Sequence, residues 1–224
     1  MPITLPRLFS ALGLALLIAP AAQAETRFAV SLGGDHLGRL GHTLAAGTRD
    51  LSLLLDSTPF GVFDGTYSGR TVKEGATARH SGRTRSTRKS RDVSMRTEAG
   101  QLREVALSPA AERTALTDAA AVPGAVLDPV SGFGQLLEAQ ACPDGLRIYD
   151  GRRIGALAAI SESREAGQVV CEARYQIEQG PGYLEPIGVT RLTLELRYDV
   201  TPTGWQLARL RARSGIFALS LDRQ

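Results

Sequence analysis

The chain is poor in aromatic and sulfur-containing residues. Aromatic side chains make up 5% of its 224 residues, and it has two cysteines, three histidines and one tryptophan. Leu, Val, Ile and Ala must therefore fill the core. A chain of this length can bury such a core without help from a metal ion.

Lysine is almost absent. Only Lys73 and Lys89 are lysines, so 24 of the 26 basic residues are arginines, and the net charge is +3. A bias of this kind across a whole chain is typical of a GC-rich genome rather than of a nucleic-acid surface. We therefore expect no nucleic-acid partner.

Long apolar runs are confined to the N-terminus. Met1–Ala24 resembles a secretory signal peptide, with Arg7 before an apolar run and Ala22-Gln23-Ala24 as the small-x-small cleavage pattern. No cysteine lies near the cut between Ala24 and Glu25, so a lipoprotein signal is not expected. The prediction is a single secreted domain over residues 25–224 with no membrane span.

Alternation of apolar and polar residues predicts mainly β structure. Leu192 to Val200 alternate with charged residues, and Thr201-Pro202-Thr203-Gly204 follows as a turn. A slip in phase between Leu207 and Leu210 indicates a β-bulge. Val169 to Ile177 alternate in the same way and direct Cys171 toward the core.

The first half of the mature chain shows the same pattern. We expect strands around 28–32, 51–55 and 60–67, and a hairpin that joins 94–97 to 102–107. Residues 109–123 have no clear period and are interpreted as a long loop between the two halves.

One segment has helical periodicity. Asp128 and Pro129 are an N-cap and a first-turn proline, and Val130, Phe133, Leu136 and Leu137 recur on one helical face. We predict a helix from about 129 to 139.

The two cysteines, Cys142 and Cys171, are most simply one disulfide in an oxidising compartment; two free buried thiols are the alternative. Asp150-Gly151 predicts a tight hairpin turn before the strand of Cys171. In such a meander, the strand before Asp150 and the strand of Cys171 lie about 9–10 Å apart, too far for a disulfide. Cys142 must then end a segment that folds over the core face.

Motifs for catalysis, metals or cofactors are not recognisable. His36 and His42 would share a face on one continuous strand, but no third ligand has a suitable spacing for zinc. Pro129-Val130-Ser131-Gly132 lacks the first glycine of a nucleophile elbow. We therefore expect no catalytic, cofactor or metal residues.

A basic run offers a candidate anion patch. Its members fall within 13 residues: Arg79, Arg83, Arg85, Arg88, Lys89 and Arg91. One interpretation is an anionic partner such as lipid headgroups. The alternative, favoured by the intervening Ser and Thr, is the solvated face of a strand and loop.

Several of these pieces together resemble a family of proteobacterial secreted proteins, domain of unknown function 3108. They are 127–131 with its Asp-Pro pair, a cysteine, 146–153 ending in Asp-Gly-Arg-Arg, and a second cysteine followed by Tyr175. The resemblance implies a periplasmic, mostly β protein and no settled activity. By its position, the Asp-Gly pair makes a turn, and Arg152 and Arg153 are expected to flank it in solvent.

The expected fold is mainly β: one curled antiparallel sheet of nine or ten strands, a half-barrel or open barrel, with one short helix against its concave face. The leading functional hypothesis is a non-enzymatic periplasmic module that binds a lipid or other apolar ligand, or assists envelope assembly. The alternatives are an envelope hydrolase or transferase with dispersed residues, and a scaffold that binds another envelope protein along a sheet edge.

Overall fold

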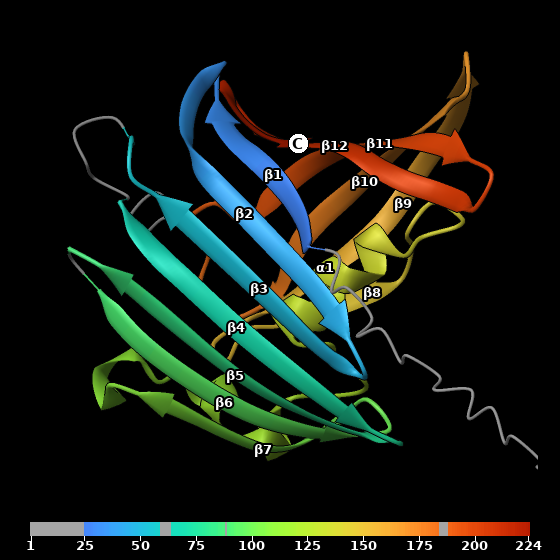
Figure 1. Ribbon diagram of the computed structural model, residues 1–224. Helices are drawn as coiled ribbons and strands as arrows, with labels where there is room; N and C mark the ends of the chain where they lie inside the picture. Colours follow the sequence, from blue (N-terminus) through green and yellow to red (C-terminus); the bar gives the residue numbers. More distant parts are fainter. Residues whose placement is uncertain (1–24, 59–63, 88, 184–187) are drawn as a thin grey trace, which may run out of the picture.

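A computed structural model describes residues 25–58, 64–87, 89–183 and 188–224. Four parts of the earlier predictions lie outside these residues: the predicted signal peptide, Ala24 at its cleavage point, the first half of the strand expected at 60–67, and Arg88 of the basic run. The architecture matches the predicted class: one curled, open antiparallel sheet with one α-helix, α1 (Pro129–Leu137), against its concave face (Figure 1).

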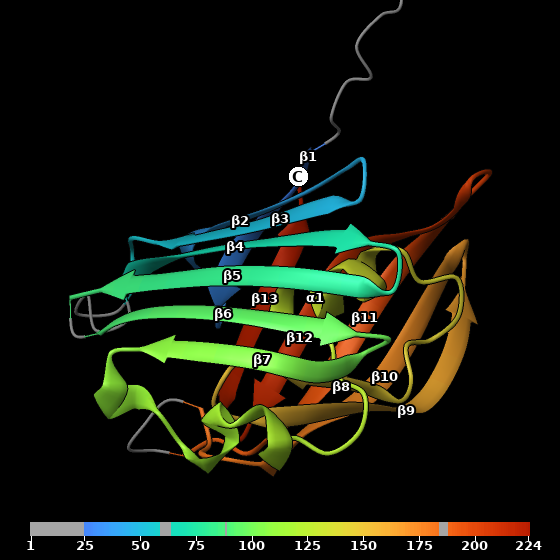
Figure 2. The ribbon, with the colours of Figure 1, turned by 90° about the horizontal axis from the view of Figure 1, so that it is seen from below.

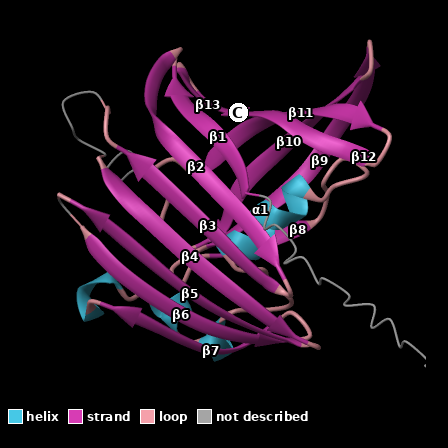
Figure 3. Ribbon diagram, in the orientation of Figure 1, coloured by secondary structure: helices cyan, strands magenta, loops and turns pink. Residues whose placement is uncertain are grey.

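The sheet has 13 strands rather than the nine or ten expected. In chain order they are β1 (Glu25–Leu32), β2 (Asp35–Ala45), β3 (Thr48–Leu55), β4 (Gly65–Glu74), β5 (Thr77–Ser86), β6 (Ser90–Glu98), β7 (Gln101–Ser108), β8 (Leu146–Tyr149), β9 (Ile154–Glu165), β10 (Gln168–Gln179), β11 (Arg191–Thr201), β12 (Gly204–Ser214) and β13 (Phe217–Arg223). The undercount arose because polar strands such as β5 carry little apolar alternation. Figure 3 shows the strands of the sheet in magenta.

Two meanders make up the sheet, and the first and last strands join them. The order is β7-β6-β5-β4-β3-β2-β1-β13-β12-β11-β10-β9-β8, so β1 pairs with β13 in the middle. The two edges, β7 and β8, are consecutive in the chain, and strand twist curls them toward each other.

A short clasp spans the gap between these edges. The backbone of Ala125 bridges to Gln101 of β7, and Leu127 bridges in parallel to Ile148 of β8. Val126 N–H donates to the Gly100 carbonyl at 2.8 Å, and Leu127 N–H donates to the Arg147 carbonyl at 2.8 Å. We call residues 125–127 the seam clasp.

The segment before the clasp corrects a prediction. Residues 109–123 are not a plain loop but contain three 3₁₀ helices beside β7, η2 (Ala110–Glu112), η3 (Ala115–Thr117) and η4 (Ala119–Ala121) (Figure 2). Leu116 and Val122 are buried there in a second core with Tyr149 and Ile154. Helices of one turn are too short to show a period, which is why the sequence pattern missed them.

The local predictions around the core are confirmed in most places. Asp128 caps α1, which ends at Leu137, two residues before the expected end. The bulge between Leu207 and Leu210 is present, since Arg197 pairs with Arg209 and Tyr198 pairs with Leu207. Val169 and Cys171 are fully buried on the inner face of β10.

The Asp150-Gly151 turn differs from the prediction. Tyr149 pairs with Ile154, so the turn has four residues and the two arginines belong to it. Asp150 Oδ1 accepts the backbone N–H groups of Arg152 and Arg153 at 2.9 and 3.0 Å. This side-chain hydrogen bonding favours the longer turn over the two-residue type.

Candidate functional site

The two cysteines form a disulfide across the concave face. Their Cα atoms lie 5.5 Å apart, and Cys171 is fully buried on β10. Strand β9 separates β8 from β10, so Cys142 reaches Cys171 from the segment after α1 rather than from a neighbouring strand. The bond therefore anchors the end of the helical segment to the sheet.

The basic run divides into two parts, and two arginines of its outer part are already paired. Arg79, Arg83 and Arg85 lie on β5, where Arg79 is exposed opposite Arg96. Arg83 and Arg85 both donate to Asp92 of β6, at 3.2 and 2.8 Å. The hydrogen bond from Arg85, followed by that from Arg83, lowers the pKa of Asp92 although partial desolvation opposes the shift.

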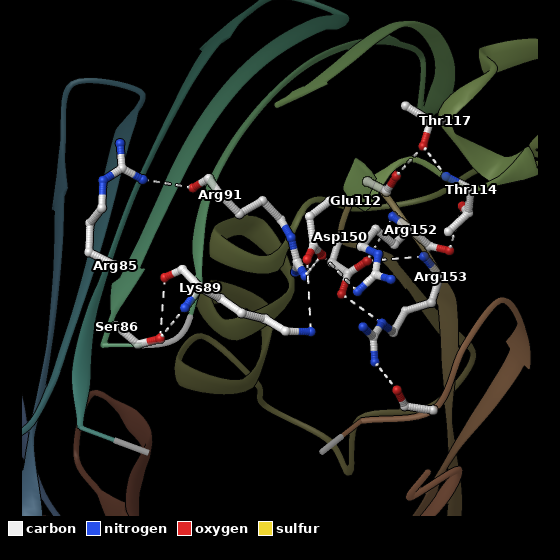
Figure 4. A network of polar contacts seen from close by, with 12 residues as sticks. Arg85, Ser86, Lys89, Arg91, Glu112, Thr114, Thr117, Asp150, Arg152 and Arg153 are labelled. Carbon is white, nitrogen blue, oxygen red and sulfur yellow. Dashed lines mark hydrogen bonds and ion pairs between the residues drawn. The ribbon is translucent and has the colours of Figure 1, made fainter. Parts of the chain in front are cut away.

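The other part turns inward. Lys89 Nζ lies 3.8 Å from Glu112 Oε1, and Arg91 Nη2 donates to Glu112 Oε2. Arg152, from the β8–β9 turn, places Nη1 3.1 Å from the same Glu112 oxygen. Glu112 thus gathers cations from two segments about 60 residues apart in the chain (Figure 4).

Arg153 continues the network toward the concave face. Its Nε lies 3.0 Å from Asp150 Oδ2, and its Nη1 donates to the Gly182 carbonyl at 2.6 Å. The guanidinium carbon lies 4.3 Å from the centre of the Tyr183 ring, a cation–π distance. Tyr183 in turn hydrogen-bonds through its hydroxyl to Tyr175 of β10, at 2.9 Å.

We call this set the arginine cluster; its members are Lys89, Arg91, Glu112, Asp150, Arg152 and Arg153. Arg152 and Arg153 are only 8% and 4% exposed, which corrects the expectation that they flank the turn in solvent. Thr114 and Thr117 explain the difference, because their hydroxyls bind the carbonyls of Arg152 and Gly151 and draw the turn against η3.

The described residues of the arginine cluster bring cations and carboxylates close together. Lys89, Arg91 and Arg152 surround Glu112, and Arg153 lies beside Asp150. Burial raises the pKa of Glu112, but the hydrogen bond from Arg91 and the charges of Arg91, Arg152 and Lys89 together lower it. Arg91 Nε is buried and has no hydrogen-bond partner in the part of the chain that the structure describes. This N–H is therefore a donor that an acidic ligand group can satisfy.

An apolar strip continues from this cluster along the inner face. Burial falls along each strand in the same direction: Phe28 and Val30 are fully buried but Leu32 only partly, and Leu221 is buried but Leu219 only partly. We define the apolar strip by its partly buried members, Leu32, Leu53, Leu55, Ile177, Leu192, Ala212 and Leu219. They lie at the strand ends beyond the part of the concave face that α1 covers.

The strip and the cluster meet through tyrosines. Tyr175 pairs across the strands with Leu192 of the strip, and its hydroxyl contacts that of Tyr183, which stacks under Arg153. A ligand with an acidic head and an apolar body would therefore find both environments side by side.

A second polar group lies inside the sheet under α1. Asp128 Oδ1 accepts the hydroxyl of Thr71 at 2.7 Å and lies 3.2 Å from His80 Nδ1, while Oδ2 accepts the Ser131 hydroxyl at 2.7 Å. Burial raises the pKa of Asp128, but hydrogen bonding and charge from His80, together with Ser131, lower it to about 2. This group fastens the start of α1 to β4 and β5.

The remaining histidines do not form a metal pair. The β1–β2 register shifts so that Val30 pairs with Gly38 and Ser31 with His36, which makes Leu37 a bulge. The prediction that His36 and His42 share a face required one continuous strand, and the bulge interrupts it. His36 is therefore exposed, whereas His42 is buried. The described residues contain no group of three or more His, Cys, Asp or Glu side chains able to hold a metal ion.

Hollows open on the surface of the described residues. A groove of about 610 Å³ crosses the outer face of β4 to β7, between the Arg70–Asp50 and Arg83–Asp92 pairs. A smaller hollow of about 230 Å³ lies at the end of the sheet away from the arginine cluster, beside His42. Polar side chains contribute to the lining of both.

Comparisons with known proteins leave the family open. No family model and no curated protein matches the chain. A solved structure described as a beta-barrel-like protein of domain of unknown function DUF1849 from Brucella abortus aligns over 90% of this chain and 95% of its own, with a TM-score of 0.48 and 10% identity. Among the described residues, no helix is long and apolar enough to cross a membrane.

The sequence contained part of the site. The basic run and the Asp-Gly-Arg-Arg motif were both visible, but only as separate solvated features. Glu112 carried no signal, because a single carboxylate in an Ala-rich segment has no pattern around it. The contact between these three segments depends on the curl that brings β6, η2 and the β8–β9 turn together.

Proposed function

We propose that this protein is a periplasmic, non-enzymatic binding module for an anionic amphiphile, a lipid or other apolar ligand that carries one acidic group. The observation that carries the proposal is the direct succession of arginine cluster, Tyr183, Tyr175 and apolar strip. Membership of the family of domain of unknown function 3108 remains part of the same proposal.

The guanidinium groups of the arginine cluster support a ligand with an acidic head group. A guanidinium forms strong, charge-assisted hydrogen bonds with a carboxylate or phosphate. Arg91 is the best-placed donor, because its Nη2 binds Glu112 while its Nε is buried without a hydrogen-bond partner among the described residues.

The partly exposed side chains of the apolar strip support a ligand with an apolar body. Seven apolar side chains on six adjoining or nearby strands stay half-buried on a face whose other end is fully buried. Covering such side chains is worth about 25 cal/mol per Å² of apolar surface. An aliphatic chain laid along the strip would gain this energy.

Binding of laurate and of dodecanol, measured by calorimetry below their aggregation concentrations, tests the proposal. Wild-type protein is expected to bind laurate more tightly than dodecanol. Arg91→Gln is expected to weaken laurate binding about tenfold, equivalent to about 1.4 kcal/mol, and to leave dodecanol unchanged. Arg83→Gln, on the outer face, is the matched control and should behave as wild type.

A variant of the strip tests the apolar half. Leu219→Asn should weaken both ligands, with the melting temperature recorded to confirm that the protein is folded. Absence of binding by wild-type protein, or equal laurate affinity in wild type and Arg91→Gln, would contradict the proposal.

Export is the other part of the proposal, supported by the leader pattern of residues 1–24 and by a disulfide that an oxidising compartment would preserve. Native mass spectrometry of protein isolated from its own periplasm should give a chain that begins at Glu25 and a retained lipid mass. An intact leader on protein isolated from the cytosol would contradict export. A co-purifying protein in place of a lipid would favour the scaffold hypothesis.

A further inference from the structure

The hairpin between β12 and β13 ends in two exposed apolar side chains. Ile216, in the turn, is 94% exposed, and Phe217, the first residue of β13, is 55% exposed. They are the most exposed large apolar side chains of the described residues, and we call the pair the hairpin tip. Turns are usually made of glycine and small polar residues, so two large apolar side chains at this position need an explanation.

The hairpin tip continues the apolar line of β13. Leu221 is buried, Leu219 is partly buried and Phe217 is exposed. The three side chains lie on one face of the strand because they are two residues apart. Phe217 pairs with Ser214 and Leu219 pairs with Ala212, so the hairpin keeps this alternation to its end. The apolar strip, to which Leu219 belongs, therefore runs out from the core to the hairpin tip.

Arginines flank the hairpin tip on the outer face of the same end of the sheet. Arg191 begins β11, and Arg211 and Arg213 lie near the end of β12, where Arg213 pairs with Thr193. Carboxylates lie in this region as well: Arg213 Nη2 is 3.9 Å from Glu195 Oε2, and Asp35 begins β2 beside the tip. Arg191 and Arg211 are exposed and form no salt bridge with another described residue.

The form of the hairpin tip favours a lipid surface over a protein partner. A stable protein interface buries at least about 1,000 Å² of surface, and the two side chains of one turn supply only a small part of that area. A bilayer accepts a narrow apolar wedge, because each buried methylene group contributes and anionic headgroups attract nearby arginines. Apolar residues at the extreme end, with cations set back along the strands, match the order of acyl chains and headgroups.

We propose that the hairpin tip docks this protein on the surface of an anionic lipid bilayer. Ile216 and Phe217 enter the outer part of the acyl region, while Arg191, Arg211 and Arg213 contact headgroup phosphates. In this orientation the open end of the apolar strip faces the membrane. Docking requires neither the arginine cluster nor a bound amphiphile, so it is independent of the proposed function.

Flotation of full-length mature protein with lipid vesicles tests the docking. One set of vesicles is phosphatidylcholine alone, and the other is an equimolar mixture of phosphatidylcholine and phosphatidylglycerol. We expect binding to the anionic vesicles and at least about tenfold weaker binding to phosphatidylcholine alone. Raising the salt concentration from about 50 to about 500 mM should weaken binding to the anionic vesicles, because salt screens exposed charges.

Variants assign the binding to the hairpin tip. Ile216→Ser, in an exposed turn where the fold is not at risk, should weaken binding to anionic vesicles about tenfold. Arg191→Gln should weaken it about fivefold and leave binding to phosphatidylcholine unchanged. Leu44→Ser is the matched control, since Leu44 is an exposed apolar residue beside the β2–β3 turn at the opposite end of the sheet. Ile216→Ser should bind laurate without vesicles as wild type does, which separates docking from ligand binding.

Fluorescence distinguishes insertion of the hairpin tip from adsorption by charge alone. Trp205 is the only tryptophan and lies at the opposite end of the sheet, so Trp205→Phe with Ile216→Trp places a single indole at the tip. Anionic vesicles should shift its emission to shorter wavelength and protect it from iodide. Absence of vesicle binding by wild-type protein, equal binding by Ile216→Ser, or an unshifted indole on bound protein would overturn the proposal. A wild-type dimer that Ile216→Ser dissociates would also overturn it, because a second copy would then cover the tip.

Discussion

At the scale of single residues, Asp128 joins the helix to the sheet through its Oδ1 atom. Oδ1 accepts the backbone N–H groups of Val130 and Ser131, at 2.9 and 3.0 Å, as well as the Thr71 hydroxyl. The sequence predicted the cap but not the partners on β4 and β5. An N-cap depends on the next three residues, whereas Thr71 and His80 reach Asp128 only when the sheet has formed.

Because the pKa of Asp128 is lowered in the folded protein, the free energy of unfolding is expected to fall at acidic pH. Because the folded-state pKa is about 2 and the unfolded value is near 3.8, the stabilisation is present above about pH 4 and is lost as the pH falls through 2. We expect a loss of about 2 kcal/mol from this group over that range.

Urea unfolding midpoints from pH 5 to pH 2 measure this effect. Asp128→Asn should be less stable at neutral pH and should lack this part of the pH dependence, while Asp118→Asn, at the exposed cap of η4, serves as the control. Parallel pH profiles for wild type and Asp128→Asn would show that the carboxylate is not responsible.

At the scale of elements, the seam clasp closes the gap between the two edge strands of the open sheet, β7 and β8. The Tyr149 N–H donates to the Leu127 carbonyl at 2.8 Å, so the clasp bonds to β8 on both sides of its bridge. The clasp itself has no strand pattern, because three residues are too few to alternate. The predicted loop of 109–123 ends before the clasp, and the sequence pattern predicts no element for residues 125–127.

Leu127→Pro should loosen the clasp, since proline cannot donate to the Arg147 carbonyl. We expect a loss of about 2–3 kcal/mol in unfolding free energy and faster hydrogen exchange at the Tyr149 amide. Ala119→Pro is the matched control, because it places proline at the first position of η4 after an extended residue. Unchanged exchange at Tyr149 in Leu127→Pro would contradict a closing role for the clasp.

Strand β9 illustrates how an open sheet protects an edge. It runs eight residues beyond its pairing with β8, and Ala158–Glu165 is exposed. The register to β10 shifts at Ile160, and Glu162, Arg164 and Glu165 follow. A bulge and charges on an edge strand are the features by which natural sheets prevent pairing with other chains, so this edge is a poor site for the scaffold hypothesis.

At the scale of the whole molecule, one disulfide fastens the segment after α1 to β10 of the sheet. The 29-residue separation of Cys142 and Cys171 predicts, in the chain-entropy model, about 3–4 kcal/mol of stabilisation. The core is large enough to fold without it.

Equilibrium urea unfolding of Cys142→Ala/Cys171→Ala tests this expectation. The double variant should remain folded at 25 °C with an unfolding free energy about 3 kcal/mol lower and an unchanged urea dependence. A loss below about 1 kcal/mol, or two reactive thiols in the denatured wild-type protein, would contradict a stabilising bridge.

The sequence by itself determined the elements whose signals are local. Alternation over ten residues predicts a strand, Asp128-Pro129 predicts the start of a helix, and a phase slip near Leu207 predicts a bulge. Each of these signals depends only on neighbours in the chain. The class of the fold followed, since alternation of this extent leaves one apolar face that a curled sheet must enclose.

Only the tertiary structure decided the number of strands, the burial of Arg152 and Arg153, and the meeting of Arg91 with Glu112. These depend on which distant segments the curl brings together. A charged side chain has the same appearance in a sequence whether it faces water or a partner in a distant segment. Long-range pairing, rather than local preference, sets the energy of such groups, and for this reason both candidate sites became visible only in three dimensions.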